Sequence, residues 1–301
     1  MKVIVLLIDS PERDVSARSA KAVANAARAA GFEVAEINLL DGISILDTIA
    51  KDSVVMPISH GINAEDGWIQ SELEKRGLSF LGSGSLSSEN CFDKWKARTI
   101  LEKAGIKMPA AVHVTKDSFN EQKLAKNPYV LKILHGGSSI GTLIVRNPAE
   151  VEQSKINEIF NMEKTAVLEE LIAGTEITVP MLDQLALPVI EIIPPPEQEF
   201  DYENKYNGAT QELLPPKNVS ADIQMKAQKI TEHVHRTMNC RHLSRTDFML
   251  DREGNLYVLE INTMPGMTDQ SLYPKAAKVA GMEMPALVTK FVEMVKHDYN
   301  L

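Results

Sequence analysis

The chain has 301 residues, 44% of them hydrophobic and 24% charged, which is long enough and apolar enough for two or three packed units. Its net charge of −9 argues against a nucleic-acid partner, because surfaces that bind phosphate backbones are usually basic. No stretch reaches the roughly 18 apolar residues of a membrane span, which argues against a membrane partner.

Residues 1–90 alternate between apolar runs of strand length and helical stretches. Residues 3–8, 32–39 and 54–58 are predicted strands, and residues 15–30 and 68–76 are predicted helices. Strands that alternate with helices indicate a parallel sheet with crossover helices. The first strand has no small-residue cleavage site after it, so it does not resemble a signal peptide, and we expect a cytoplasmic protein.

Two loops follow strands of this sheet, at the edge where open α/β sheets bind their ligands. Residues 9–16 contain Glu12, and residues 59–67 begin Ser59-His60-Gly61. An acid at Glu12 could instead only favour the start of the next helix, and a lone histidine is more often structural than catalytic. From the residues alone, both alternatives stay open.

The middle of the chain combines lysines with a glycine- and serine-rich turn. Lys94 opens a predicted helix over residues 92–103, and Lys132 lies inside a predicted strand, residues 129–134. The turn 135–141, HGGSSIG, precedes another strand, and its backbone N–H groups could surround phosphate oxygens. It is not a Walker A loop, and a flexible surface hairpin is the alternative. A lysine within a strand favours the phosphate site, because buried lysine is rare unless paired.

Two later segments are ambiguous by composition alone. Residues 167–176, VLEELIAGTE, form a strand, a linker and the start of another strand, which suits either an adenine-binding hinge or a polar hairpin. Residues 200–206, FDYENKY, follow three prolines and would ordinarily be an exposed connection. Residues 221–238, 274–280 and 284–296 are predicted helices.

The segment 245–272 carries oxygen ligands on a predicted hairpin. Apolar runs at 248–250 and 256–261 flank the turn Asp251-Arg252-Glu253-Gly254. Asp247 lies near the first run, and Glu260 and Asn262 share one strand face, so three oxygen donors could meet around a hard cation such as Mg²⁺. Taken singly, each could be an ordinary turn or surface residue.

The strings SRTDFML and YVLEINTMPGMTDQSL closely resemble the metal-binding and second-substrate region of D-alanine–D-alanine ligases, which belong to the ATP-grasp superfamily. The resemblance extends to the other segments described above. It implies an α/β (α+β multidomain) ATP-grasp fold with an N-terminal parallel-sheet domain. The expected units are residues 1–90, a central lobe at 91–180 with the glycine-rich lid, and a C-terminal lobe at 181–301 with the metal site.

The resemblance also implies a role for each matching residue. Catalytic roles fall to Glu12, Ser138, Tyr206, Arg245 and Gly266, and substrate binding to His60, Lys205, Ser271 and Leu272. Nucleotide binding falls to Lys94, Lys132, Glu169, Leu171, Ile172 and Glu176, and metal binding to Asp247, Glu260 and Asn262. The implied reagents are ATP, two molecules of D-alanine and Mg²⁺, with two ions expected and Mn²⁺ as a substitute. Many relatives are dimers, which favours a homodimer.

The sequence departs from the family's pattern at several positions, and the changed first loop keeps another substrate open. Ile8-Asp9 replaces a glycine pair and shortens the first loop, Ile133 replaces a proline, and Phe200 replaces a tyrosine. A related carboxylate–amine ligase with another substrate is therefore an alternative. A nucleotide-binding module without catalysis is a second one, although the catalytic and metal positions are all filled.

Cys91 and Cys240 are far apart in the sequence and lack metal-ligand spacing. We expect two free thiols, as a reducing compartment allows.

Overall fold

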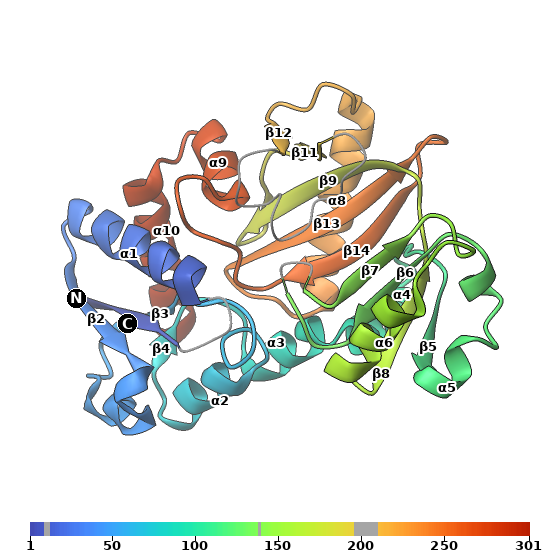
Figure 1. Cartoon of the computed structure of the whole chain (residues 1–301). Helices are drawn as coiled ribbons and strands as arrows, with labels where there is room; N and C mark the ends of the chain where they lie inside the picture. Colours follow the sequence, from blue (N-terminus) through green and yellow to red (C-terminus); the bar gives the residue numbers. More distant parts are fainter. Residues whose placement is uncertain (9–12, 138–139, 196–209) are drawn as a thin grey trace.

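The computed structural model describes residues 1–8, 13–137, 140–195 and 210–301, and its strands form three sheets covered by helices (Figure 1). The N-terminal sheet is parallel, with strand order β2-β1-β3-β4. Its elements are β1 Lys2–Leu7, α1 Arg13–Ala29, β2 Glu33–Asn38, η1 Leu39–Asp41, η2 Ile43–Thr48, β3 Val54–Pro57, α2 Trp68–Lys75 and β4 Ser79–Phe80. The parallel sheet with crossover helices predicted from the sequence is confirmed.

The central sheet is antiparallel, in the order β5-β8-β6-β7. Its elements are α4 Lys94–Lys103, β5 Ala111–Thr115, α5 Lys116–Phe119, η3 Leu124–Lys126, β6 Tyr129–Ile133, β7 Thr142–Val145, α6 Gln153–Met162 and β8 Thr165–Glu170. An additional helix that the sequence analysis missed, α3 Ser85–Phe92, connects this unit to the N-terminal sheet. The two helices are separate because Asp93 has extended backbone angles and its carboxylate accepts hydrogen bonds from the N–H groups of Trp95 and Lys96.

The C-terminal sheet has the order β12-β11-β9-β13-β14, with β10 paired to β9. Its elements are β9 Gly174–Leu182, β10 Leu185–Ala186, β11 Ile190–Ile193, β12 Gln211–Leu213, α8 Ala221–Thr237, β13 Leu243–Asp251, β14 Leu256–Asn262, α9 Leu272–Val279 and α10 Met284–Tyr299. The predicted hairpin is β13–β14. Its turn uses Gly254 at φ 82° and an Asp251 carboxylate that accepts the Asn255 N–H at 2.7 Å.

The last two helices of the chain complete the core of the first sheet. One apolar cluster joins Val3 of β1 and Val23 of α1 to Tyr273 of α9 and to Phe291 and Val295 of α10. Figure 1 shows α1 and α10 side by side against the N-terminal sheet. This packing places the loop before α9 beside α1, which positions the site described below.

The division into three units at residues 90 and 180 stays a prediction. In the structure, residue 90 lies within α3 and residue 180 within β9. Because β9 pairs with β11 and β13, it belongs to the C-terminal sheet. Among the described residues, no helix is long and apolar enough to cross a membrane.

Candidate active site

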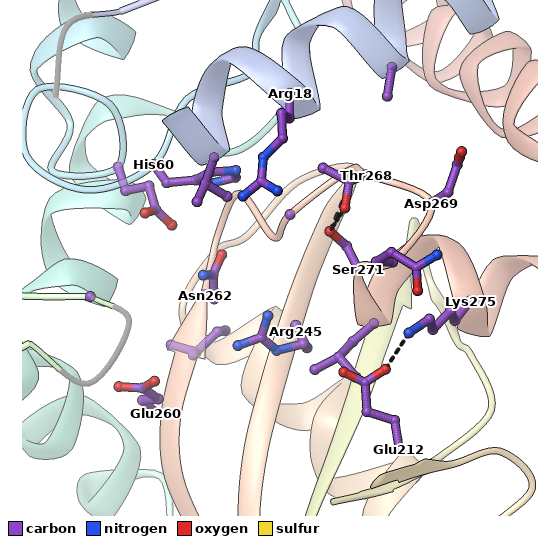
Figure 2. A pocket seen from close by; sticks show the side chains of 18 of the residues that line it. Arg18, His60, Glu212, Arg245, Glu260, Asn262, Thr268, Asp269, Ser271 and Lys275 are labelled. Atoms are coloured by element: carbon purple, nitrogen blue, oxygen red, sulfur yellow. Dashed lines mark hydrogen bonds and ion pairs between the residues drawn. The ribbon is translucent and has the colours of Figure 1, made fainter. Parts of the chain in front are cut away.

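A cavity of about 850 Å³ opens between the three sheets (Figure 2). Of the residues expected from the sequence, its walls bring together His60, Lys94, Arg245, Glu260, Asn262, Gly266, Ser271 and Leu272. These residues come from the loop after β3, the start of α4, the ends of β13 and β14, and the connection to α9. The cavity therefore collects the described substrate positions, two of the metal positions and one of the nucleotide positions at one place.

The register of the hairpin gives the cavity a polar floor. Arg245 lies opposite Asn262 and Asp247 opposite Glu260, so the four side chains share one face of the sheet. Arg245 donates from Nε and from one terminal nitrogen to the two oxygens of Asp247, both at 2.8 Å. Thr178 of β9 also donates to Asp247. This fixed fork orients the guanidinium, which reaches the cavity wall.

The charge of Arg245 is secured by the same pairing. Burial by itself would lower the pKa of Arg245, but the charge of Asp247 and the hydrogen bonds to it raise that pKa above its ordinary value. The guanidinium therefore stays positive at every pH at which the protein is folded.

His60 holds the 264–267 loop. Its Nδ1 lies 2.9 Å from the carbonyl oxygen of Met264, which only an N–H can satisfy, so Nε2 is the acceptor for the Ser19 hydroxyl at 3.3 Å. Burial lowers the pKa of His60 to about 4; the bond to Met264 opposes this shift. The ring is thus neutral near pH 7. Ser19 also accepts the N–H of Met267 at 3.2 Å, which links α1 to the same loop.

The connection to α9 leaves little room for a side chain at position 266. A Cβ there would lie 2.8 Å from the Ser271 hydroxyl oxygen, closer than packed atoms approach. Ser271 is the residue before the first turn of α9, and no side chain caps that turn. Its hydroxyl accepts the Thr268 N–H at 3.1 Å. The Leu272 N–H and its neighbours in this turn have no intrahelical partner, which suits a carboxylate.

Lysines and acids cluster near the cavity on the side toward the central sheet. Lys94 donates to the carbonyl oxygen of Gly136 and lies 4.0 Å from Glu260. Lys132 of β6 pairs with Glu169 of β8 at 2.8 Å. Burial lowers the pKa of Lys94. Burial also acts to lower the pKa of Lys132, but the charges of Glu169 and Glu260, with the hydrogen bond to Glu169, together raise it. Lys94 lines the cavity together with Gly136 and Gly137 of the glycine-rich turn.

Arg98 of α4 completes this cluster, a role that the sequence did not indicate. It is 1% exposed and donates to Glu169 at 3.1 Å and to the carbonyl oxygen of Pro109 at 2.7 Å. Burial acts to raise the pKa of Glu169, but Lys132 and Arg98 together lower it. The carboxylate therefore stays ionised and holds both cations in place.

The proposed metal ligands fit a hard cation by their chemistry, since all three supply oxygen. Glu260 is partly exposed and faces the cavity, as Figure 2 shows. The side-chain oxygen of Asn262 accepts the Met264 N–H at 2.8 Å, and Asp247 is held by Arg245 and Thr178. No three His, Cys, Asp or Glu side chains in the described part of the chain are grouped for a metal.

Several predicted residues lie apart from the cavity wall. Lys132 and Glu169 lie outside its lining, as do Leu171 and Ile172 of the β8–β9 connection and Glu176 of β9. The N–H of Leu171 bonds the carbonyl of Pro128 at 3.2 Å. Glu12, Ser138, Lys205 and Tyr206 fall outside the described residues.

The cavity also contains residues that the sequence analysis did not single out. Figure 2 shows Arg18 projecting from α1 into the cavity between His60 and Thr268. Arg18 follows Val15 by three positions, so helical spacing could have indicated a shared face. Lys275 pairs with Glu212 at 2.6 Å, and no local pattern relates two residues 63 positions apart.

The chain resembles one set of proteins along its whole length. A family model described as "D-ala D-ala ligase C-terminus" matches residues 100–293. A D-alanine–D-alanine ligase of Methylacidiphilum infernorum is 37% identical over 95% of this chain and 92% of its own length. The D-alanine–D-alanine ligase of Halalkalibacterium halodurans is 36% identical over 98% of this chain and 99% of its own length. The chain belongs to the D-alanine–D-alanine ligase family.

Solved structures extend this assignment to the fold. The D-alanine–D-alanine ligase of Bacillus anthracis superposes with a TM-score of 0.87 at 30% identity, covering 100% of this chain and 99% of that one. The structure of the same enzyme complexed with ATP superposes with a TM-score of 0.83 at 28% sequence identity. The α/β ATP-grasp fold and the ligase class expected from the sequence are confirmed.

Proposed function

We propose that the protein joins two molecules of D-alanine at the expense of ATP, giving D-alanyl-D-alanine for peptidoglycan synthesis. The single observation that carries the proposal is the cavity itself, in which the Arg245–Asp247 fork, Glu260, Lys94 and the Gly266–Leu272 connection meet. The family membership of the chain supports the same reaction.

In the first step, a carboxylate oxygen of one D-alanine attacks the γ-phosphorus of ATP, giving ADP and an acyl phosphate. Lys94 and Lys132 supply positive charge for the phosphates, and Glu169 holds Lys132 in position. Mg²⁺, held by Glu260 and Asn262 with Asp247, would neutralise phosphate charge when bound. Glu169, Leu171, Ile172 and Glu176 are the proposed residues around the adenosine.

In the second step, the amine of the other D-alanine attacks the acyl carbon, inorganic phosphate leaves and the amine nitrogen loses a proton. Arg245 and the Gly266 N–H stabilise the oxyanion that forms at the carbonyl, a contribution of about 3 kcal/mol per donor in other enzymes. Both ring nitrogens of His60 are already bonded, so we assign it to holding the 264–267 loop.

The second carboxylate needs partners that are not already used. Ser271 and the Leu272 N–H stand at the start of α9, and Lys205 is the matching family residue. We add Arg18, which has no hydrogen bond or ion pair within the described part of the chain and projects into the cavity. By contrast, Arg245 and Lys275 are each paired with a carboxylate. Glu12, Ser138 and Tyr206 keep their proposed places around the first substrate.

We further propose a cytoplasmic homodimer that uses two Mg²⁺ ions or Mn²⁺. A related carboxylate–amine ligase is the second candidate, because Ile8-Asp9 changes the first loop.

The test is phosphate release from ATP and Mg²⁺ with D-alanine, L-alanine, D-serine, D-lactate or no addition. We expect release to depend on D-alanine and to match dipeptide formation. Release that depends on another acid would support the second candidate, and ATP binding without release would reject both.

A further inference from the structure

The two cysteines of the chain lie side by side although 149 positions separate them, with their sulfur atoms 3.8 Å apart. Cys91 is in the last turn of α3, and Cys240 follows the end of α8. Cys240 is fixed by the end of that helix: its N–H bonds the carbonyl of His235 at 2.9 Å, after Asn239 at φ 53°. Both sulfurs are thus anchored by helices from different parts of the fold.

The two thiols differ in access and in acidity. Cys91 is 6% exposed and lines the active-site cavity, whereas Cys240 is half-buried and lines a second cavity of about 650 Å³ near α8 and α10. The hydrogen bond from Cys91 lowers the pKa of Cys240 despite burial, and Ser87 and Ser83 add to this effect. The same contact, with burial, raises the pKa of Cys91. The accessible thiol is therefore the better nucleophile.

We propose that Cys240 is a site of oxidation by hydrogen peroxide or small organic hydroperoxides, and that Cys91 resolves the product to a disulfide. The Cys240 sulfur attacks the peroxide O–O bond, giving a sulfenic acid and water from hydrogen peroxide, or an alcohol from an organic hydroperoxide. The Cys91 sulfur then attacks the sulfenic sulfur, which forms the S–S bond and releases a molecule of water. The peroxide is reduced by two electrons, and the two thiols are oxidised by two.

The disulfide would act on the nucleotide side of the active-site cavity. Cys91, Phe92 and Lys94 all line that cavity, and a disulfide requires the sulfurs to approach to about 2.05 Å. The approach of the two sulfurs would shift residues 91–94 and with them Lys94, which we assign to the phosphates. We therefore expect the KM for ATP to rise several-fold on oxidation and to recover with a dithiol reductant. This kinetic effect rests on the proposed function, whereas the oxidation itself does not.

The chemical test uses the full chain with hydrogen peroxide, followed by thiol titration, intact mass and peptide mapping. We expect the loss of both thiols, the loss of two hydrogens from the mass, and a cross-linked Cys91–Cys240 peptide in a monomeric band on a non-reducing gel. Two unreacted thiols, or oxygen added to either sulfur without the cross-link, would overturn the proposal.

Two variants separate the roles of the thiols. Cys91→Ser should accumulate the Cys240 sulfenic acid, trapped by dimedone, because the resolving thiol is absent. Cys240→Ser should keep the reduced activity and lose the peroxide effect on the KM for ATP. Dimedone labelling of Cys91 in Cys240→Ser at the rate seen for Cys240 would contradict the assignment. If no ATP turnover is found at all, the peptide map still decides the oxidation.

Discussion

Two buried carboxylates lie near the active-site cavity. One is paired with a cation from its own strand, and the other with cations from distant parts of the chain. Asp247 is held by Arg245, two residues earlier on the same strand. Glu169 of β8 is held by Lys132 of β6 and by Arg98 of α4, which lies 71 positions away. The first grouping needs only β13 to be extended, whereas the second needs a helix and two strands to be packed together.

We expect the first pair to affect the catalytic rate and the second group to affect the stability of the fold. The Arg245–Asp247 fork faces the cavity, so a change there should act on the reaction. Arg98 lies behind Glu169, is buried and does not line the cavity, so a change there should act first on folding. The following predictions test this separation, beginning with the largest effect.

Arg245→Ala should lower kcat by about a hundredfold or more, because it removes an oxyanion donor from a water-excluding site. Arg245→Lys keeps a charge but not the fork, so it should recover only part of the loss. Steady-state kinetics with circular dichroism as a folding control measure both. Full activity of folded Arg245→Ala would contradict the role of this side chain.

Arg98→Met should lower the free energy of unfolding by about 3 kcal/mol, because it leaves Glu169 buried with one cation fewer. Urea denaturation measures the change. In the background of Glu169→Gln the same substitution should cost much less, since the charge it balanced is gone. Equal costs in both backgrounds would show that Arg98 acts through packing and not through Glu169.

Arg18→Gln should reduce kcat/KM for the accepting D-alanine about tenfold, as expected when a charge-assisted hydrogen bond is lost. With D-alaninamide as acceptor, which lacks the carboxylate, the substitution should have no effect. Lys21→Gln, one turn later on α1 and also on the cavity wall, is the matched control. An equal loss with both acceptors would remove Arg18 from the carboxylate site.

His60→Asn should reduce the acid sensitivity of the fold. The folded pKa of His60, about 4, is below the ordinary 6.5, so between these values the unfolded chain binds a proton that the folded chain does not. The free energy of unfolding therefore falls as pH drops from 6.5 to 4. In the variant, the free energy of unfolding should change less steeply with pH, by an amount that corresponds to up to about one bound proton. Urea titrations at several pH values measure this slope. The pKa values of His235 and His242 are also lowered to about 4, so these two histidines still make the free energy of unfolding of the variant depend on pH.

The same contrast explains how much could be predicted from the sequence. The period of two along a strand places Glu260 and Asn262 on one face, and Asp251 and Gly254 indicate the turn, so the β13–β14 hairpin was predictable. The parallel sheet followed from alternating strands and helices. Residue roles came from the resemblance to the family and not from these patterns.

Contacts between distant segments left no local pattern. The bond of His60 to Met264 spans 204 positions, and α9 and α10 return to the first sheet only because their apolar faces fit it. Arg98 looked like one more charge on an amphipathic helix, and its burial depends on the Glu169 opposite. The contact of Cys91 with Cys240 likewise exists only in the assembled fold.

The central claim is that one D-alanine carboxylate is activated by phosphate in this cavity before the second amine attacks. The most direct measurement uses D-alanine labelled with ¹⁸O in its carboxylate, together with ATP and Mg²⁺, and mass analysis of the products. The account predicts labelled D-alanyl-D-alanine and one ¹⁸O in each released phosphate, since the transferred oxygen leaves with the phosphoryl group. Unlabelled phosphate, or phosphate released without D-alanine, would contradict it.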